Sequence, residues 1–248
     1  KGKDKKITFL DTQGHEAFSK MREKETKIAD IAILVVSAED GVKPQTVEAY
    51  KAIAESNTPF VVAINKIDKA GADIERTKMN LAENEIYLEN YGGKVPFAPI
   101  SAKTGDGIDN LLSLILILAE LENFEGDAKE NASGFVLESN MDSKRGIQAT
   151  LIVKNGTLKK GMYVVSEDSI CSTRIIENFL GKIISEASYS SPIRLIGFDK
   201  MPKAGSIFKA FENKKDAENF AQNWKIENTG PNKDKQEESD KKIIPIIL

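Results

Sequence analysis

The sequence is poor in the residues that build disulfide scaffolds, and it has no long apolar run. Cysteine and histidine each occur once among 248 residues. A lone cysteine, Cys171, cannot form an internal disulfide, which fits a reducing compartment, and we expect it to be a small buried apolar side chain rather than a nucleophile. The longest apolar run, Leu114 to Ala119, is far shorter than the roughly 20 residues that a membrane-spanning helix needs. The sequence therefore predicts neither a disulfide scaffold nor contact with the membrane interior.

Charge of one sign is also lacking. The 35 Lys and Arg residues nearly balance the 38 Asp and Glu residues, so the net charge is −3. A field this weak favours neither nucleic acid nor an anionic membrane, although a local patch could still contact RNA. The 40% hydrophobic content and the length allow one large domain or two ordinary ones.

Apolar runs and helical periodicity alternate through the first half of the chain. Strands are predicted at 7–10, 31–36, 60–64 and 95–100, and helices at about 16–28, 44–58, 74–89 and 107–119. Alternating strands and helices indicate a parallel sheet with right-handed crossovers. The continuous apolar run at 31–36 predicts a strand that is buried on both faces.

The pattern changes near Ala132. Short strands separated by Gly, Asn and Lys turns are predicted at 134–138, 148–153, 162–165, 193–196 and 207–211, which indicates a small all-β barrel or sandwich. A helix is predicted at 214–222, and 225–242 reads as a charged, solvated linker. We therefore divide the chain into an α/β domain (1–123), a β-barrel domain (132–212), a helix with linker (213–242) and the opening strand of a third domain (243–248).

Three loops, each directly after a predicted strand, carry the polar residues of a candidate nucleotide site. The first is Asp11-Thr12-Gln13-Gly14-His15. An Asp in this position can hold Mg²⁺ through water, and Gly14 lets a backbone N–H approach a γ-phosphate. A polar side chain beside that glycine can orient an attacking water, so His15, the only histidine, is the candidate catalytic residue.

The second loop is Asn65-Lys66-Ile67-Asp68 and the third is Ser101-Ala102-Lys103. The Asp68 carboxylate can accept two hydrogen bonds from the N1–H and 2-amino groups of guanine, a donor pair that adenine lacks. The stem of Lys66 can cover the base plane, Asn65 can tie the loops together, a backbone N–H of the third loop can reach guanine O6, and Ser101 can brace the second loop. Ligands of parallel sheets bind at such strand ends, although the same residues also suit turns of an unrelated α/β protein.

These loops resemble the third, fourth and fifth motifs of the translational GTPases. The stretches Gly14 to Phe18, Ala38 to Thr46 and Lys154 to Gly161, with Ile243 to Leu248, are similar to bacterial-type initiation factor two. The resemblance implies a G domain of the P-loop NTPase class followed by a β-barrel domain, with GTP or GDP and Mg²⁺ as cofactors. It also implies a cytoplasmic, monomeric GTP hydrolase in which His15 positions the water. Its partners would be the small ribosomal subunit, ribosomal RNA and initiator tRNA.

Two features depart from the family pattern. No Gly-x-x-x-x-Gly-Lys-Ser/Thr phosphate loop is found, so we interpret the sequence as partial, with an N-terminally truncated sheet, weak GTP and Mg²⁺ binding, and no C-terminal domain for initiator tRNA. Gln13 stands where the family has proline and is interpreted as a tolerated substitution, the alternative being a second residue that positions water. Two other hypotheses stay open: a ribosome- or RNA-binding piece without hydrolysis, and a GTPase of elongation or selenocysteine delivery.

Overall fold

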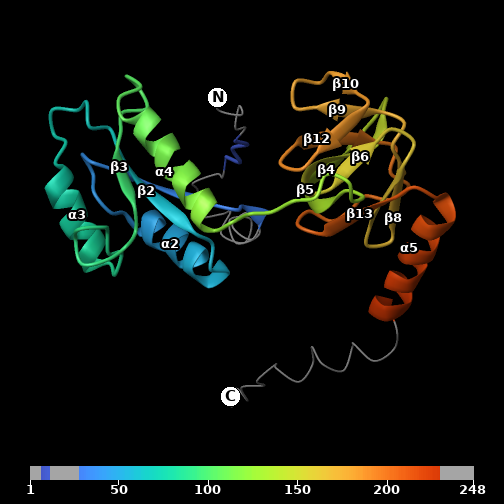
Figure 1. Cartoon of the computed structure of the whole chain (residues 1–248), viewed down its shortest axis with the longest axis horizontal. Coiled ribbons are helices and arrows are strands. Elements are labelled where there is room, and N and C mark those ends of the chain that lie inside the picture. Colours follow the sequence, from blue (N-terminus) through green and yellow to red (C-terminus); the bar gives the residue numbers. More distant parts are fainter. Residues whose placement is uncertain (1–6, 12–27, 230–248) are drawn as a thin grey trace, which may run out of the picture. The chain divides into compact units, whose positions relative to one another are not determined.

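The computed structural model describes residues 7–11 and 28–229. They form two compact units (Figure 1). One comprises Phe9–Glu125, and the other runs from Gly126 onward and includes Ile7 and Thr8. Among the described residues, no helix combines the length and the apolar character needed to cross a bilayer.

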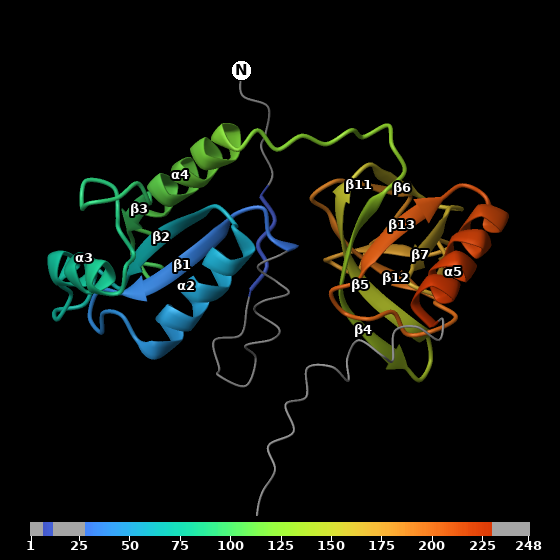
Figure 2. The ribbon, with the colours of Figure 1, turned by 90° about the horizontal axis from the view of Figure 1, so that it is seen from below.

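The first unit is a parallel sheet flanked by helices, as expected. The sheet order is β1 (Ala32–Ser37), β2 (Phe60–Asn65) and β3 (Phe97–Pro99), and the helices are α2 (Pro44–Ser56), α3 (Ile74–Glu83) and α4 (Ile108–Leu121). Figure 2 shows α2 on one face of the sheet and α4 on the other. Residues Val61 to Ile64 of the central strand β2 are completely buried, because helices cover both faces of the sheet.

The prediction that strand 31–36 is buried on both faces is wrong. Leu34 and Val36 are buried, but Val35 is 55% exposed. The reason is the position of β1 at the edge of the described sheet, since α4 packs mainly on β3 and β2.

The predicted strand Ile7–Leu10 does not form. These residues have no regular structure, and the Thr8 hydroxyl donates to the Ser190 carbonyl at 2.6 Å. A strand needs a neighbour for its ladder of hydrogen bonds, and β1, β2 and β3 pair only with one another among the described residues. The predicted helix at 16–28 lies outside the described residues except for Ile28.

Helix α3 also ends earlier than the predicted residue 89. Glu85 takes the left-handed conformation at φ 64°, Ile86 N–H donates to Leu81 O at 2.9 Å, and Glu85 N–H donates to Ala82 O at 3.1 Å. This pair of bonds is a Schellman motif, which closes a helix. Leu81 and Ile86 are both buried beside it, so local backbone geometry and core packing end the helix together.

The second unit is a curled antiparallel β domain. Its eight-stranded sheet has the order β10-β9-β12-β5-β4-β13-β7-β8, and β11 pairs with β6 in a separate ribbon. The strands are β4 (Ser133–Asp142), β5 (Gly146–Asn155), β6 (Thr157–Lys159), β7 (Tyr163–Ser166), β8 (Ser169–Ser172), β9 (Ile176–Asn178), β10 (Ile183–Ile184), β11 (Glu186–Ser188), β12 (Pro192–Ile196) and β13 (Ile207–Phe211). The sequence pattern missed β6 and β8 to β11, all of them four residues long or shorter.

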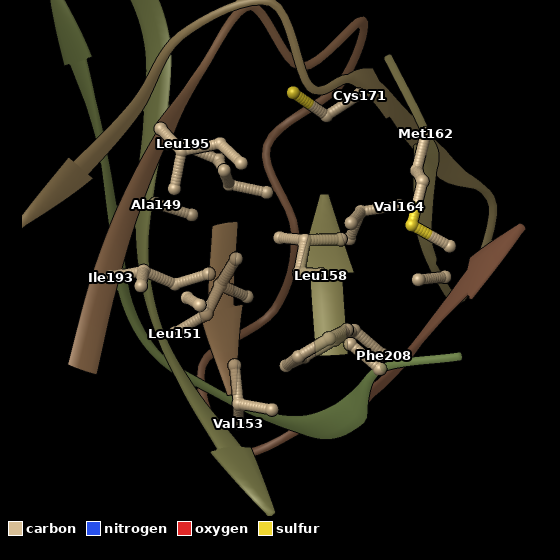
Figure 3. Packing of buried hydrophobic residues seen from close by; sticks show 14 of the residues in the cluster. Ala149, Leu151, Val153, Leu158, Met162, Val164, Cys171, Ile193, Leu195 and Phe208 are labelled. Atoms are coloured by element: carbon tan, nitrogen blue, oxygen red, sulfur yellow. The ribbon is translucent and has the colours of Figure 1, made fainter. Parts of the chain in front are cut away.

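An apolar core fills the inside of the curled sheet. Figure 3 shows Leu151, Ile193, Leu195 and Phe208 pointing into the same interior. Cys171 lies there too with 1% of its surface exposed, and burial raises the pKa of its thiol to about 12. The expectation that it is a small buried apolar side chain is confirmed.

Helix α5 (Lys214–Thr229) extends beyond its predicted end at residue 222 and takes up the first residues of the predicted linker. Its apolar face packs on β7 through Ala217, Ala221 and Val165, and no proline or glycine interrupts the helix before Gly230. The remainder of that linker and the predicted strand at 243–248 lie outside the described residues.

Candidate guanine-nucleotide site

The carboxyl ends of the three parallel strands carry the candidate site. Because parallel strands end at the same edge of a sheet, the loops that follow β1, β2 and β3 are neighbours. Two of these loops are the predicted segments Asn65–Asp68 and Ser101–Lys103.

Asn65 joins these two loops. Its Oδ1 accepts hydrogen bonds from the N–H of Lys66 at 2.7 Å and from the N–H of Ala102 at 3.0 Å. Ile67 N–H adds a bond to Ile100 O at 3.3 Å, while the Ile67 side chain packs against the core of the unit. Lys66 takes a left-handed backbone conformation, φ 66°, which turns the chain sharply after β2.

Asp68 is held by Ser101. The buried Ser101 hydroxyl donates to Asp68 Oδ1 at 2.8 Å and accepts from Thr104 N–H at 3.2 Å. This bond is the main cause that lowers the pKa of Asp68, with smaller contributions from Lys103 and Lys69. Asp68 is therefore an ionised and oriented carboxylate, which can accept two parallel N–H donors from one edge of a base.

Glycine allows the third loop to fold back on β3. Gly107 has φ 73°, and a Cβ atom on it would lie 2.1 Å from the carbonyl oxygen of Pro99. A side chain is thus excluded by space as well as by conformation. This close approach fixes the loop of residues 101–107, and with it the position of Ser101.

A fourth group of residues joins the site from the loop after β1. Ala38 N–H donates to Asn65 O at 2.7 Å, and Lys66 Nζ lies 3.2 Å from Asp40 Oδ2. Sequence reasoning did not include Asp40 among the site residues. The run Ala38 to Thr46 carried a signal only through its resemblance to a family, because nothing in the local pattern links it to Lys66.

The structure brings together the seven predicted residues of the second and third loops, namely Asn65, Lys66, Ile67, Asp68, Ser101, Ala102 and Lys103. Asp11, the predicted Mg²⁺ ligand, is exposed and lies in an irregular segment. Thr12, Gln13, Gly14 and His15 lie outside the described residues. The two described loops carry the residues that were predicted to contact a guanine base, whereas Asp11 is the one described residue with a predicted role near the phosphates.

In the second unit, the positive charge of the neighbouring residues Lys144 and Arg145 is partly neutralised. The Arg145 guanidinium forms a bidentate ion pair with the carboxylate of Glu177, whose side chain is 8% exposed. Asp142 Oδ1 accepts from the backbone N–H groups of Lys144 and Arg145, both at 2.8 Å. Arg145 therefore closes the β4–β5 turn over a buried acid, and Lys144 keeps an exposed side chain.

Comparisons with protein families cover both units. The family described as the elongation factor Tu GTP binding domain matches residues 1–120, and the family described as elongation factor G domain 2 matches residues 131–211. The chloroplastic translation initiation factor IF-2 of Rhodomonas salina is 47% identical over 217 residues, covering 88% of this chain and 29% of that protein. The translation initiation factor IF-2 of Finegoldia magna is 44% identical over 225 residues, covering 91% of this chain and 30% of that protein.

Solved structures show the same fold. GDP-bound aIF5B from Aeropyrum pernix matches with a TM-score of 0.64 at 23% identity, over 83% of this chain and 44% of that one. Elongation factor SelB from Methanococcus maripaludis, in complex with the GTP analogue GppNHp, matches with a TM-score of 0.62 at 26% identity, over 82% and 46%. The chain spans about three tenths of the length of the two curated relatives described above. On this sequence similarity and fold, the chain belongs to the translational GTPases, in the family of translation initiation factor two.

Proposed function

We propose that the described loops are the guanine-reading half of the nucleotide site of a GTP-hydrolysing translation initiation factor. The observation that carries this proposal is the ionised Asp68, held by Ser101 next to a loop that Asn65 ties to it. In the proposed complex, Asp68 accepts hydrogen bonds from guanine N1–H and the 2-amino group. A backbone N–H of the third loop donates to O6, and the stem of Lys66 covers one face of the base.

The same donors and acceptors would reject adenine. Adenine presents an unprotonated N1 and a hydrogen at C2, so the Asp68 carboxylate would lose its partners and face a lone pair. Selectivity is strong when the wrong ligand leaves a polar group of the site unpaired. A site built to accept a pair of donors can reject a ligand that lacks them by about 10⁴-fold.

Base selectivity is tested by titrating the 248-residue chain with GDP and ADP. GDP should bind and ADP should not. Asp68→Asn should weaken GDP binding by at least about ten-fold and improve binding of xanthosine diphosphate, because the amide offers a donor to the 2-oxo group. Glu55→Gln is the matched control, since it removes one exposed carboxylate at the opposite end of α2 from the site. Equal binding of GDP and ADP, or unchanged GDP affinity in Asp68→Asn, would leave an RNA- or ribosome-binding role without nucleotide as the better account.

The hydrolytic step is proposed from the family pattern. Mg²⁺ bound to the nucleotide would supply Lewis-acid stabilisation of the phosphates, with Asp11 as a ligand through water. His15 would orient the attacking water beside Gly14. Thr12 and Gln13 would complete this loop. In a chain that carries a phosphate-binding loop, Gln13→Pro should lower the hydrolysis rate at unchanged GTP affinity if Gln13 positions water, and should leave the rate unchanged if Gln13 is a tolerated substitution.

The biological role is proposed from the relatives, which are named translation initiation factors. We infer a cytoplasmic, monomeric factor that helps to place initiator tRNA on the small ribosomal subunit and promotes subunit joining. Contact of the second unit with ribosomal RNA would use exposed cations such as Lys159 and Lys160, in preference to the paired Arg145. Such contact acts through phosphates, so it should weaken steeply as salt concentration rises.

A further inference from the structure

The loop after β1 is a rigid turn. Ser37 Oγ accepts from the backbone N–H of Glu39 at 3.3 Å and of Asp40 at 3.2 Å, and Gly41 N–H donates to Ser37 O at 2.8 Å. Gly41 has φ 71°, and a Cβ atom there would lie 2.7 Å from Asn80 Oδ1. The backbone of Asp40 is therefore fixed by its own turn.

This turn is also bonded to the elements around the site. Ala38 N–H donates to Asn65 O at 2.7 Å, and Asp73 N–H donates to Ala38 O at 2.9 Å. Arg76 Nη2 donates to Glu39 O at 2.8 Å, and Asp73 begins helix α3 by accepting Arg76 N–H at 2.9 Å. These hydrogen bonds connect the turn that carries Asp40 to the loop that carries Lys66 and to the start of α3.

The Asp40 carboxylate meets the end of the Lys66 side chain. Lys66 Nζ lies 3.2 Å from Asp40 Oδ2, and Lys43 Nζ lies 3.8 Å from Asp40 Oδ1. A hydrogen bond between the side chains of Ser37 and Asp40 is the largest cause that lowers the pKa of Asp40, and Lys66 is the next. The Asp40 carboxylate is therefore ionised at neutral pH. Both members of the Asp40–Lys66 pair remain partly open to solvent, with 42% and 46% of their side chains exposed.

A lysine that covers a base needs such an anchor. Its four-carbon stem has many rotamers when the ammonium group is free, and ordering so long a side chain costs conformational entropy. An ammonium group held by a fixed carboxylate restricts the stem before ligand arrives. Less ordering is then left for the binding step, which is the general benefit of preorganisation.

We propose that Asp40 is a positioning residue of the guanine site, which anchors the Lys66 ammonium so that the lysine stem is held ready against the face of the base. The inference rests on the proposed guanine site. It adds a carboxylate from the loop after β1 that would contact no atom of the nucleotide and would act only through Lys66.

The test is a double-mutant cycle on the 248-residue chain, with GDP as ligand and Asp40→Asn and Lys66→Met as the variants. Asp40→Asn should weaken GDP binding about two- to five-fold, the range of an exposed ion pair. The same substitution should have no effect in the Lys66→Met background. The loss should shrink as salt is added, because the Asp40–Lys66 pair is screened. Glu55→Gln, with the same change of charge, should bind GDP like the unsubstituted chain.

The possible outcomes distinguish the role of Asp40 from the proposed guanine site on which it depends. If the unsubstituted chain does not prefer GDP to ADP, both proposals fall. If it prefers GDP and Asp40→Asn binds it equally well, or loses affinity equally in the Lys66→Met background, only the role of Asp40 falls. Thermal unfolding checks for a merely structural role, since Asp40→Asn should keep the midpoint of Glu55→Gln, and a clear drop of the midpoint would overturn positioning as the cause.

Discussion

The two units differ in how far their sheets are closed. Among the described residues, the sheet of the first unit ends at β1, where Val35 is 55% exposed, and its polar loops lie at the carboxyl ends of the strands. The sheet of the second unit curls around one core in which Leu151, Leu195 and Phe208 are fully buried. The proposed nucleotide site therefore lies in the unit with the more open sheet, while the second unit has the more enclosed core. We expect the second unit to be stable by itself and the first to be the weaker of the two.

Substitutions in the two cores test most directly whether the units unfold independently. Phe208→Ala should destabilise the second unit by about 3–5 kcal/mol, and Leu81→Ala should destabilise the first by about 2–5 kcal/mol, because each leaves a cavity around a fully buried position. Calorimetry of the unsubstituted chain should show two thermal transitions, and each variant should shift only one of them. A single cooperative transition that both variants shift would contradict the independence of the units.

A smaller effect is expected at the site of the first unit. Ser101→Ala removes the donor that orients Asp68, which should weaken GDP binding about three- to ten-fold. Binding requires the carboxylate, so affinity falls as pH drops through the pKa of Asp68. Because Ser101 lowers that pKa, the fall should begin at higher pH in Ser101→Ala than in the unsubstituted chain. Titration of GDP over a series of acidic buffers measures both effects, and identical pH profiles would show that Ser101 does not act through Asp68.

The smallest effect is expected on the open face of β1. Val35→Thr should change the stability of the first unit by less than about 0.5 kcal/mol, because an exposed strand position loses little on gaining a hydroxyl. Val62→Thr is the matched control, because it makes the same exchange at a fully buried position of β2, paired with Leu34, and it should cost clearly more. Urea unfolding of the two variants compares them, and equal losses would mean that the face of Val35 is covered.

Much of this organisation could be read from local patterns. The apolar run at 60–64 predicted a buried strand, and Pro44 marked the first turn of α2. These two predictions succeed because burial period and turn chemistry are properties of short segments. The polar residues after β2 and β3 were expected to form a nucleotide site, and that role stays a prediction. Short strands such as β10, with two residues, carry too little of that signal.

The sequence by itself determined the order of the elements, the parallel and antiparallel halves, and the residue types available for reading a base. Only the tertiary structure decided that Val35 is exposed, that Arg145 closes over Glu177, and that Asp40 meets Lys66. Asp40 and Lys66 are 26 residues apart, and no local pattern relates them. Their meeting depends on the register of β1 against β2 and on the turns that follow both strands, and these are properties of the folded sheet.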